Sequence, residues 1–342
     1  MKKTAIRLSV IFFLTFVFLY FFFRSVDWKA VLANLIKVDL KFFILLILLT
    51  PLHLLTRAIR WKYLLIHRKN EVSLANRFAA NAIGFTVTLI FPGRLGELVK
   101  PLYLAQKERM RKGFVMGTIF VERTFDVLIN CILLGLFLFS KPLYSSYFQV
   151  NEEGYSNLQF WGTVGVVFSS VLIVLTLAIY FFRERALAAA AFLLKPFPQK
   201  FSKRIHEFLV EFIRGLKFFH SIGNLLIYIF LSFVVWLGVV FYYWIFFYAY
   251  KIHITYFLLF PYNFLLMVGA SIPTPGMVGG FHYFSRMGLT SLYSINLSKA
   301  VSMTIVVHAI QVLVTCLIGY AILWKEGISL FQLKRLGEVA KE

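Results

Sequence analysis

The chain has 342 residues, of which 60% are hydrophobic, 18% are aromatic and only 15% are charged. This composition lies far outside the range of soluble globular domains, so we interpret the chain as a polytopic membrane protein. The formal net charge of +21 would suit nucleic acid, but the basic residues form short clusters between apolar runs, as the positive-inside rule predicts. We therefore expect no nucleic-acid partner.

The first two apolar runs predict transmembrane helices. Residues 8–23 follow a basic start, and no small-x-small cleavage site comes after them, so they predict an uncleaved first span with a cytoplasmic N-terminus. A second span at about 40–59 ends among basic residues that include Arg57 and Arg60, and this returns the chain to the cytoplasm.

Residues 75–105 form an apolar stretch that is interrupted by Pro92-Gly93. Proline removes a backbone donor and clashes with the preceding turn, while glycine lets the chain reverse. Both arms are shorter than the roughly 20 residues that a full span needs, and basic clusters flank the stretch. We therefore predict a re-entrant hairpin that enters from the cytoplasm. The alternative is an ordinary loop between two transmembrane helices.

The remaining runs complete a layout of six spans and two hairpins, with both termini in the cytoplasm. The predicted elements are a third span at 114–140, an outer loop containing Glu152, a fourth span at 160–182, a cytoplasmic linker at 183–221, a fifth span at 225–250, a second hairpin at 257–297 that enters from outside, and a last span at 300–324. The linker contains an amphipathic helix at about 201–219, which we expect on the inner leaflet. Segments assigned to the cytoplasm hold 27 of the 36 lysines and arginines, which supports this orientation.

Two parts of the chain predict an inverted repeat within a single integral membrane domain, 1–342. Residues 40–140 and 225–324 each contain a span, a hairpin and a span, in opposite orientations. Both hairpins read P-G-x-x-G, and Asn81 and Asn263 precede the two Pro-Gly pairs at similar spacing. In known transporters such repeats place the substrate near the bilayer midplane.

The two Pro-Gly breaks predict an anion site where the hairpin tips meet. Each break starts a half-helix, and the free N–H groups of a helix N-terminus favour a phosphate. A carboxylate, Glu97 or Glu122, is expected between the tips when no lipid is bound. The tip residues assigned to this site are Gly93, Gly96, Pro275, Gly276 and Gly279.

Five charged residues are further candidates for the site, namely Arg94, Glu97, Glu122, Arg123 and Asp126. Glu122 and Asp126 are four residues apart and share a helical face. Charges within a span are costly and are usually paired or functional. Three interpretations stay open, which are an internal ion network through Arg94-Glu122 or Glu97-Arg123 pairs, direct contact with a lipid headgroup, and proton coupling.

The second unit contributes His282, Arg286 and His308 as candidate binding residues. An intramembrane histidine is often a hydrogen-bonded packing residue, so that alternative stays open. Lys100 is expected only to snorkel toward the cytoplasmic interface. The two cysteines lie inside apolar runs and no metal-ligand spacing occurs, so we expect no disulfide, no metal site and no cofactor.

Known catalytic motifs are missing from the sequence. It contains no G-x-S-x-G, no H-E-x-x-H and no glycine-rich phosphate loop with lysine. We therefore expect a protein that is not an enzyme. One alternative is a membrane enzyme or enzyme subunit in lipid modification or lipid-linked sugar transfer, with Glu122 and Asp126 as the catalytic pair. Another is an ion channel or scaffold.

Three motifs, P-G-R-L-G-E, V-E-R-T-F-D and I-P-T-P-G-M-V-G-G, resemble those of the lysylphosphatidylglycerol synthase transmembrane-domain family. This is the flippase-like domain of the multiple peptide resistance factors, and the resemblance covers nearly the whole chain. It implies that the five charged residues and the Pro-Gly tips match the family's characteristic polar positions. Relatives are linked to aminoacylated phospholipids, hopanoids or polyprenyl-linked glycans. The chain stops at Glu342 without the cytosolic aminoacyl-transferring domain of full-length synthases, so we expect no synthase activity.

These features together predict an all-α lipid transporter of the flippase type. We expect it to move an anionic or phosphate-bearing lipid, such as a phospholipid, an aminoacyl-phospholipid or a polyprenyl-linked lipid, between the leaflets of the cell (inner) membrane. The expected partners are membrane lipids, and a homo-oligomer is left open.

Overall fold

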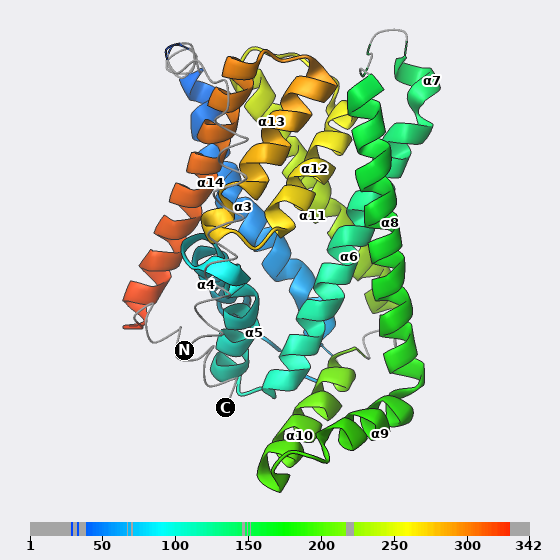
Figure 1. Ribbon diagram of the computed structural model, residues 1–342. Helices are drawn as coiled ribbons and strands as arrows, with labels where there is room; N and C mark the ends of the chain where they lie inside the picture. Colours follow the sequence, from blue (N-terminus) through cyan, green and yellow to red (C-terminus); the bar gives the residue numbers. More distant parts are fainter. Residues whose placement is uncertain are drawn as a thin grey trace.

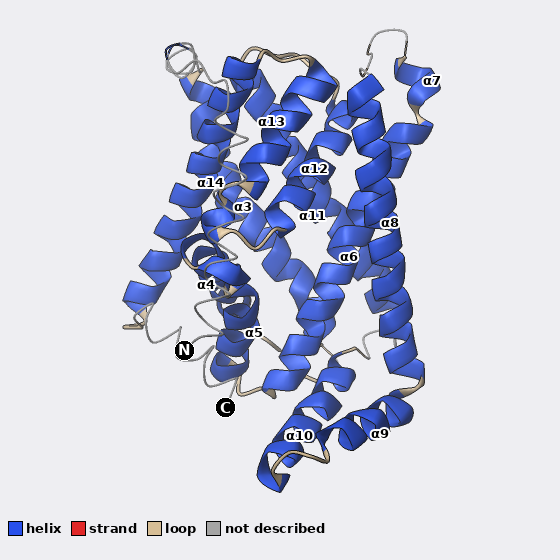
Figure 2. Cartoon of the chain, viewed as in Figure 1, coloured by secondary structure: helices blue, strands red, loops and turns tan. Residues whose placement is uncertain are grey.

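The computed structural model describes residues 29, 33, 39–66, 68–69, 71–145, 148, 150, 152–216 and 222–328. Within them it is helical and contains no strand (Figure 2). The α-helices are α3 (Leu40–Leu65), α4 (Leu74–Ile90), α5 (Gly96–Lys107), α6 (Lys112–Phe139), α7 (Lys141–Tyr144), α8 (Glu152–Phe181), α9 (Arg183–Leu194), α10 (Gln199–Gly215), α11 (Ile222–Ala249), α12 (Phe260–Ser271), α13 (Gly280–Tyr293) and α14 (Leu297–Lys325). The expected first span, 8–23, lies outside the described residues.

The prediction of an all-α polytopic membrane protein is confirmed. Four of the described helices are long and apolar enough to cross a bilayer, which are α3, α11, α14 and the Gly154–Thr176 part of α8. Helix α6 has 28 residues, or about 42 Å of helix, but it carries buried charges along its first half. These long helices run along the long axis of the molecule (Figure 1).

Side-chain caps fix where two of the spans begin. The carboxylate of Asp39 accepts a hydrogen bond from the backbone N–H of Lys41 at 2.9 Å, just before α3. The side-chain oxygen of Asn296 accepts one from the backbone N–H of Lys299 at 3.1 Å, just before α14. Such caps satisfy N–H groups that have no partner within the helix.

The first hairpin consists of α4, the short 3₁₀ turn η1 (Pro92–Arg94) and α5. Phe91 has an extended backbone (φ −101°, ψ 143°), as expected for a residue before proline, and this ends α4. Gly93 (φ 78°) and Arg94 (φ 55°) then turn the chain through the left-handed region. Arginine rarely adopts that conformation, so the tip holds Arg94 in a costly backbone geometry.

The second hairpin repeats this construction with α12, η4 (Pro275–Met277) and α13. Thr274 before the proline is extended (φ −84°, ψ 151°), and Gly276 (φ 62°) and Met277 (φ 58°) follow in the left-handed region. The two breaks lie far apart in the sequence but have the same order of conformations: an extended residue, a proline and two left-handed residues.

Each hairpin is held closed by a pair of glycines. A Cβ atom on Gly96 of α5 would overlap the carbonyl oxygen of Gly84 in α4. In the second hairpin, a Cβ atom on Gly269 of α12 would lie 2.6 Å from the carbonyl oxygen of Gly280 in α13. The arms therefore pack backbone against backbone, which leaves no space for a side chain at these crossings.

The two hairpins occupy opposite halves of the molecule, with α4 and α5 in the lower half of Figure 1 and α12 and α13 in the upper half. Their tips touch, since a Cβ atom on Gly276 would lie only 3.1 Å from the carbonyl oxygen of Leu89, near the end of α4. Helix α14 also packs on the first hairpin, where the Thr86 hydroxyl donates to the carbonyl oxygen of Thr315 at 3.1 Å.

Two features differ from the expectation. Glu152, expected in an outer loop, begins α8. The linker at 183–221 contains two helices, α9 and α10, and α10 does not lie only on the lipid surface: its backbone packs on α6, where Cβ atoms on Gly113 and Gly117 would overlap or closely approach its carbonyl oxygens. The small residues of α6 permit this close approach.

Candidate functional site

The candidate site is a group of buried charges contributed by α3, η1, α5 and α6. Helix α3 supplies Arg57 and Arg60, three residues apart and therefore on neighbouring positions of one helical face. Helix α6 supplies Glu122 and Asp126, four residues apart on one face, and Arg123, three residues before Asp126. The first hairpin adds Arg94 from its tip and Glu97 and Lys100 from α5.

Asp126 is the point where α3, α6 and α11 meet. Its carboxylate accepts hydrogen bonds from Arg60 Nη1 at 2.8 Å and from Trp236 Nε1 of α11 at 2.9 Å. Arg57 Nη1 lies 3.3 Å away and Arg123 Nη1 lies 3.1 Å away. Both oxygens of the carboxylate are therefore engaged, and Asp126 is held as a structural anion.

Glu122 is the second fully engaged carboxylate. Lys100 Nζ lies 2.8 Å from each of its oxygens, so α5 is tied to α6 at this point. Arg123 Nη2 lies 2.6 Å and Arg60 Nη2 lies 3.3 Å from Oε1. The Glu122 side chain is only 1% exposed and that of Arg60 is fully buried, which makes this a desolvated network.

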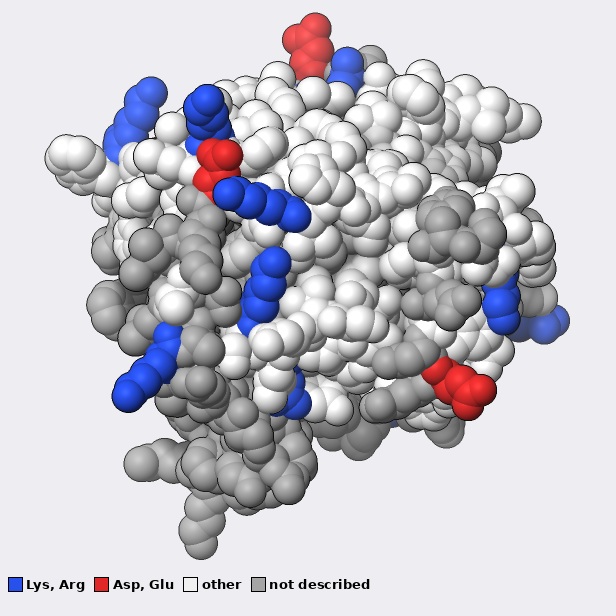
Figure 3. All heavy atoms as spheres, turned by 90° about the horizontal axis from the view of Figure 1, so that it is seen from above, with Lys and Arg blue, Asp and Glu red and all other residues white. Residues whose placement is uncertain are grey.

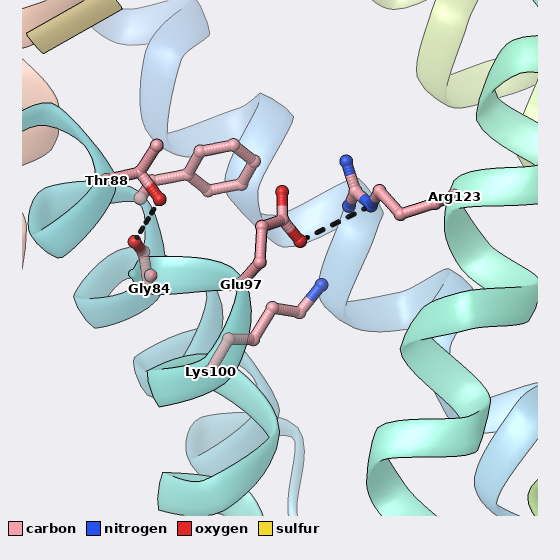
Figure 4. A pocket seen from close by; sticks show the side chains of 7 residues that line it. Gly84, Thr88, Glu97, Lys100 and Arg123 are labelled. Atoms are coloured by element: carbon pink, nitrogen blue, oxygen red, sulfur yellow. Dashed lines mark hydrogen bonds and ion pairs between the residues drawn. The ribbon is translucent and has the colours of Figure 1, made fainter. Parts of the chain in front are cut away.

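Glu97 is held more loosely. Its Oε1 lies 3.4 Å from Arg94 Nη2, and its Oε2 lies 3.5 Å from Arg123 Nε. The side chain is 25% exposed, compared with 1% for Glu122 and 4% for Asp126. Glu97 therefore stands at the open edge of the network, where Figure 4 shows it between α5 and Arg123.

Aromatic rings pack against three cations of the network, Arg57, Arg60 and Lys100. Lys100 Nζ lies 4.5 Å from the centre of the Trp61 ring, and Arg60 Cζ lies 5.5 Å from that of Tyr228. Arg57 lies over Trp236 at 5.3 Å. Such contacts stabilise a buried cation through the negative face of the ring.

The charges of the site do not balance. Five cations (Arg57, Arg60, Arg94, Lys100 and Arg123) face three carboxylates (Glu97, Glu122 and Asp126), which leaves an excess of two positive charges. Uncompensated charge is expensive inside a membrane protein. An anion would lower that cost if it bound where the network opens.

A small pocket marks this opening (Figure 4). It is lined by Gly84, Phe85, Thr88, Gly96, Glu97, Lys100 and Arg123. The space between these residues measures about 190 Å³ when the open solvent at its mouth is counted, but the pocket itself has room for only about one water molecule. The pocket therefore lies at the glycine crossing of the first hairpin, where α5 begins. Helix α5 has no side-chain cap at its N-terminus, so its first N–H groups and the nearby cations favour an anion there.

The second hairpin contacts the site through its backbone atoms. Arg94 Nη1 lies 3.5 Å from the carbonyl oxygen of Ser271, at the end of α12, so the arginine of one tip contacts the other hairpin. Gly276 and Gly279 both have positive φ angles, 62° and 98°, and form the irregular backbone on that side.

The candidate residues of the second unit form a separate group on α13 and α14. The rings of His282 and His308 lie 4.6 Å apart and nearly perpendicular, and Phe281 packs on His308 at 5.0 Å. Arg286 is partly buried one turn along α13. The structure thus brings the two histidines together, in an aromatic environment that differs from the charged network.

One expectation about the charges was wrong and another was met in part. Lys100 does not snorkel to the interface but is buried against Glu122. Of the two ion pairs considered, Glu97-Arg123 forms, whereas Arg94 pairs with Glu97 and no Arg94-Glu122 ion pair is found among the described residues.

Arg57 and Arg60 were missed as site residues because they were assigned to the basic end of the second span. The signal was present in the sequence: apolar residues Trp61, Leu64 and Leu65 follow Arg60, and α3 continues to Leu65, so these arginines lie inside the helix and not at its end. Nothing in the sequence distinguishes Trp236 of α11 as a partner of Asp126, because a tryptophan in an apolar run usually only packs against its neighbours.

The comparison with known families found a match over most of the chain. A family model described as the lysylphosphatidylglycerol synthase TM region matches residues 5–319. The chain belongs to this family. The family is named after a membrane lipid, lysylphosphatidylglycerol, so membership relates this chain to membrane lipids. Among curated proteins and among solved structures, no match was found.

Proposed function

We propose that this protein moves an anionic, phosphate-bearing lipid between the two leaflets of its membrane. The observation that carries the proposal is the excess of two positive charges in the buried network between α3, α6 and the first hairpin. A phosphodiester headgroup at the pocket would supply the missing negative charge, and its acyl chains would stay in the surrounding lipid. Membership of a lipid-related family supports the choice of a lipid over a soluble anion.

The route follows from the position of the hairpin tips. A headgroup that passes the bilayer centre needs polar groups at that depth, and these are tolerated only where protein or a cavity satisfies them. The two touching breaks, with Arg94 reaching Ser271, supply such groups. Two broken hairpins that enter from opposite sides and meet near the centre are the arrangement on which alternating access is built in known transporters.

The proposed orientation places both termini in the cytoplasm, with the protein in the cell (inner) membrane. The distribution of lysine and arginine supports it, because basic residues cluster where α5 ends and α6 begins, at the start of α9 just after α8, and along α10. Under this orientation the first hairpin enters from the cytoplasmic side.

An enzymatic role is less well supported by the geometry. A general acid or base must be free to exchange its proton with substrate. Glu122 and Asp126 are instead engaged by cations on both oxygens and are almost completely buried. We therefore propose that these carboxylates organise the arginines, and that the protein transports lipid without changing it chemically.

Proteoliposomes test the proposal directly. The transbilayer movement of fluorescent phosphatidylglycerol and phosphatidylcholine would be followed by dithionite quenching, with mass spectrometry of the recovered lipids to detect chemical modification. We expect faster movement of phosphatidylglycerol than in protein-free vesicles, no modification, and a loss of about tenfold in Arg94→Gln. Arg204→Gln removes an exposed cation on α10 and should behave as wild type. Equal movement with and without protein, or a modified lipid product, would contradict the proposal.

A further inference from the structure

The three carboxylates of the site differ in how firmly they are held. Glu122 and Asp126 have cationic partners at 2.6–2.8 Å and are at most 4% exposed. Both contacts of Glu97 are long, at 3.4 and 3.5 Å, and a quarter of its side chain is exposed. Of these three anions, Glu97 is therefore the one that can leave its partners at the lowest cost.

The two arginines beside Glu97 have donors left over. The Nε atoms of Arg94 and Arg123 are buried and make no hydrogen bond. Arg123 already gives its Nη groups to Glu122 and Asp126, so its Nε edge is the part that faces Glu97. A phosphodiester has two charged oxygens, and charge-assisted bonds from guanidinium groups to such oxygens are shorter and stronger than the contacts Glu97 makes.

Glu97 also occupies the place where an anion is favoured. It lies in the first turn of α5, at an N-terminus without a side-chain cap. With Glu97 in this position the pocket has room for about one water molecule, which is too little for a phosphate group. Figure 4 shows the Glu97 carboxylate extended into this space, with Lys100 directed into the same region.

We propose that Glu97 is an internal stand-in for the headgroup phosphate. The arriving phosphodiester takes the Arg94 and Arg123 donors and displaces the Glu97 carboxylate from the pocket, and the return of Glu97 releases the headgroup. Arg94 also contacts Ser271 of the second hairpin, so the exchange of anions at Glu97 changes the contact between the two tips. This inference rests on the proposed function and adds the residue that controls substrate release.

Binding measurements on a graded series of variants test it. Purified protein in zwitterionic detergent would be titrated with phosphatidylglycerol, with phosphatidylcholine and with inorganic phosphate, and tryptophan fluorescence would report binding. Glu97→Gln removes the competing charge and should bind phosphatidylglycerol about tenfold more tightly, which corresponds to about 1.4 kcal/mol. Glu97→Asp keeps the charge on a shorter arm and should bind more tightly by a smaller factor. Glu71→Gln removes an exposed carboxylate far from the pocket in sequence and should leave the affinity unchanged.

The same series in proteoliposomes gives the second readout. If Glu97 releases the headgroup, Glu97→Gln should move phosphatidylglycerol more slowly at saturating lipid although it binds more tightly. Unchanged or weaker binding by both Glu97 variants, while wild type binds phosphatidylglycerol, would overturn this inference and leave the proposed function standing. Binding of inorganic phosphate as tight as that of phosphatidylglycerol would overturn the choice of a lipid phosphate. Failure of wild type to bind phosphatidylglycerol at all would contradict the proposed function and this inference together.

Discussion

Asp126 shows how strongly single residues hold this protein together at membrane depth. Its carboxylate joins cations of α3 and α6 and an indole N–H of α11, so one side chain links three helices. Removing one member of a buried ionic network is strongly destabilising because the remaining charges lose their partner and cannot reach water.

Asp126→Ala should therefore lower the free energy of unfolding by about 3 to 5 kcal/mol. The unfolding midpoint in detergent, measured by denaturant titration, checks this value. Glu184→Ala breaks an ion pair on α9 whose glutamate is 89% exposed, and this control should leave the midpoint unchanged. Equal midpoints for both variants would show that the Asp126 network is hydrated.

Glu108 lies in the turn after α5, outside the charged network. Its carboxylate should make the stability of the protein depend on pH. Burial alone would raise its pKa, but hydrogen bonds from Lys69, from Asn76 and from the Ser73 backbone N–H outweigh burial and hold the pKa below its ordinary value. A pKa lowered in the folded state means that Glu108 stabilises the fold above its unfolded pKa of about 4.3, and that this contribution is lost as the pH falls through the folded value.

Thermal unfolding of wild type and Glu108→Gln at several pH values measures this contribution. Wild type should be the more stable of the two at pH 7, and the difference between the two melting temperatures should shrink as the pH falls below about 4. A difference that stays constant or grows under acid conditions would show that Glu108 does not titrate in this way.

The sequence predicted the charged residues of α6 and the first tip but not their partners. Spacing alone places Glu122 and Asp126 on one face of a helix. It does not show that Arg57 and Arg60 meet them, because positive residues near the end of a span normally mark the cytoplasmic interface. Only the packing of α3 against α6 and α11 turns these arginines inward.

At the scale of elements, the hairpins depend on small residues. The Pro-Gly breaks were predictable because proline and glycine act locally on the backbone, whatever surrounds them. The glycine crossings were not, because Gly84 and Gly96 matter only through the contact between two arms, and sequence does not reveal that contact.

Alanine substitutions at two glycines should therefore have different effects on the stability of the protein. Gly96→Ala places a methyl group on the Gly84 carbonyl oxygen and should destabilise the protein or prevent its accumulation. Gly238→Ala in α11 adds a Cβ atom that, among the described residues and outside its own stretch of helix backbone, has no atom within 4 Å, so it should be neutral or stabilise by up to about 1 kcal/mol, since alanine favours the helix. Melting temperatures and yields of both variants decide this, and a harmless Gly96→Ala would mean that the arms do not cross so closely.

At the scale of the whole molecule, composition and charge distribution were enough to predict an all-α polytopic membrane protein. The two P-G-x-x-G motifs predicted similar breaks, and the backbones agree through Gly93-Arg94 and Gly276-Met277, after which Leu95 is helical and Val278 is extended. The inverted repeat itself stays a prediction. The contact between the tips was an inference from known transporters, and the structure places Gly276 against Leu89. Figure 3, which looks on the upper end of the molecule, shows charged side chains gathered mainly toward one side, beside a wide uncharged area.

The proposed orientation is tested with single cysteines in intact cells. A cysteine at Lys107, at the end of α5, should be protected from a membrane-impermeant maleimide, and one at Glu152, at the start of α8, should react. These positions lie at opposite ends of the molecule (Figure 1), so one label pattern fixes the orientation. Reaction at Lys107 with protection at Glu152 would reverse it.

The central claim is that the excess positive charge of the network beside the first hairpin receives an anionic lipid headgroup. A cryo-electron microscopy structure in nanodiscs that contain phosphatidylglycerol measures this most directly. The account predicts headgroup phosphate density within hydrogen-bonding distance of Arg94 and Arg123, with the Glu97 side chain moved out of the pocket. Phosphatidylglycerol density only around the outer surface of the bundle, with Glu97 still between the two arginines, would contradict it.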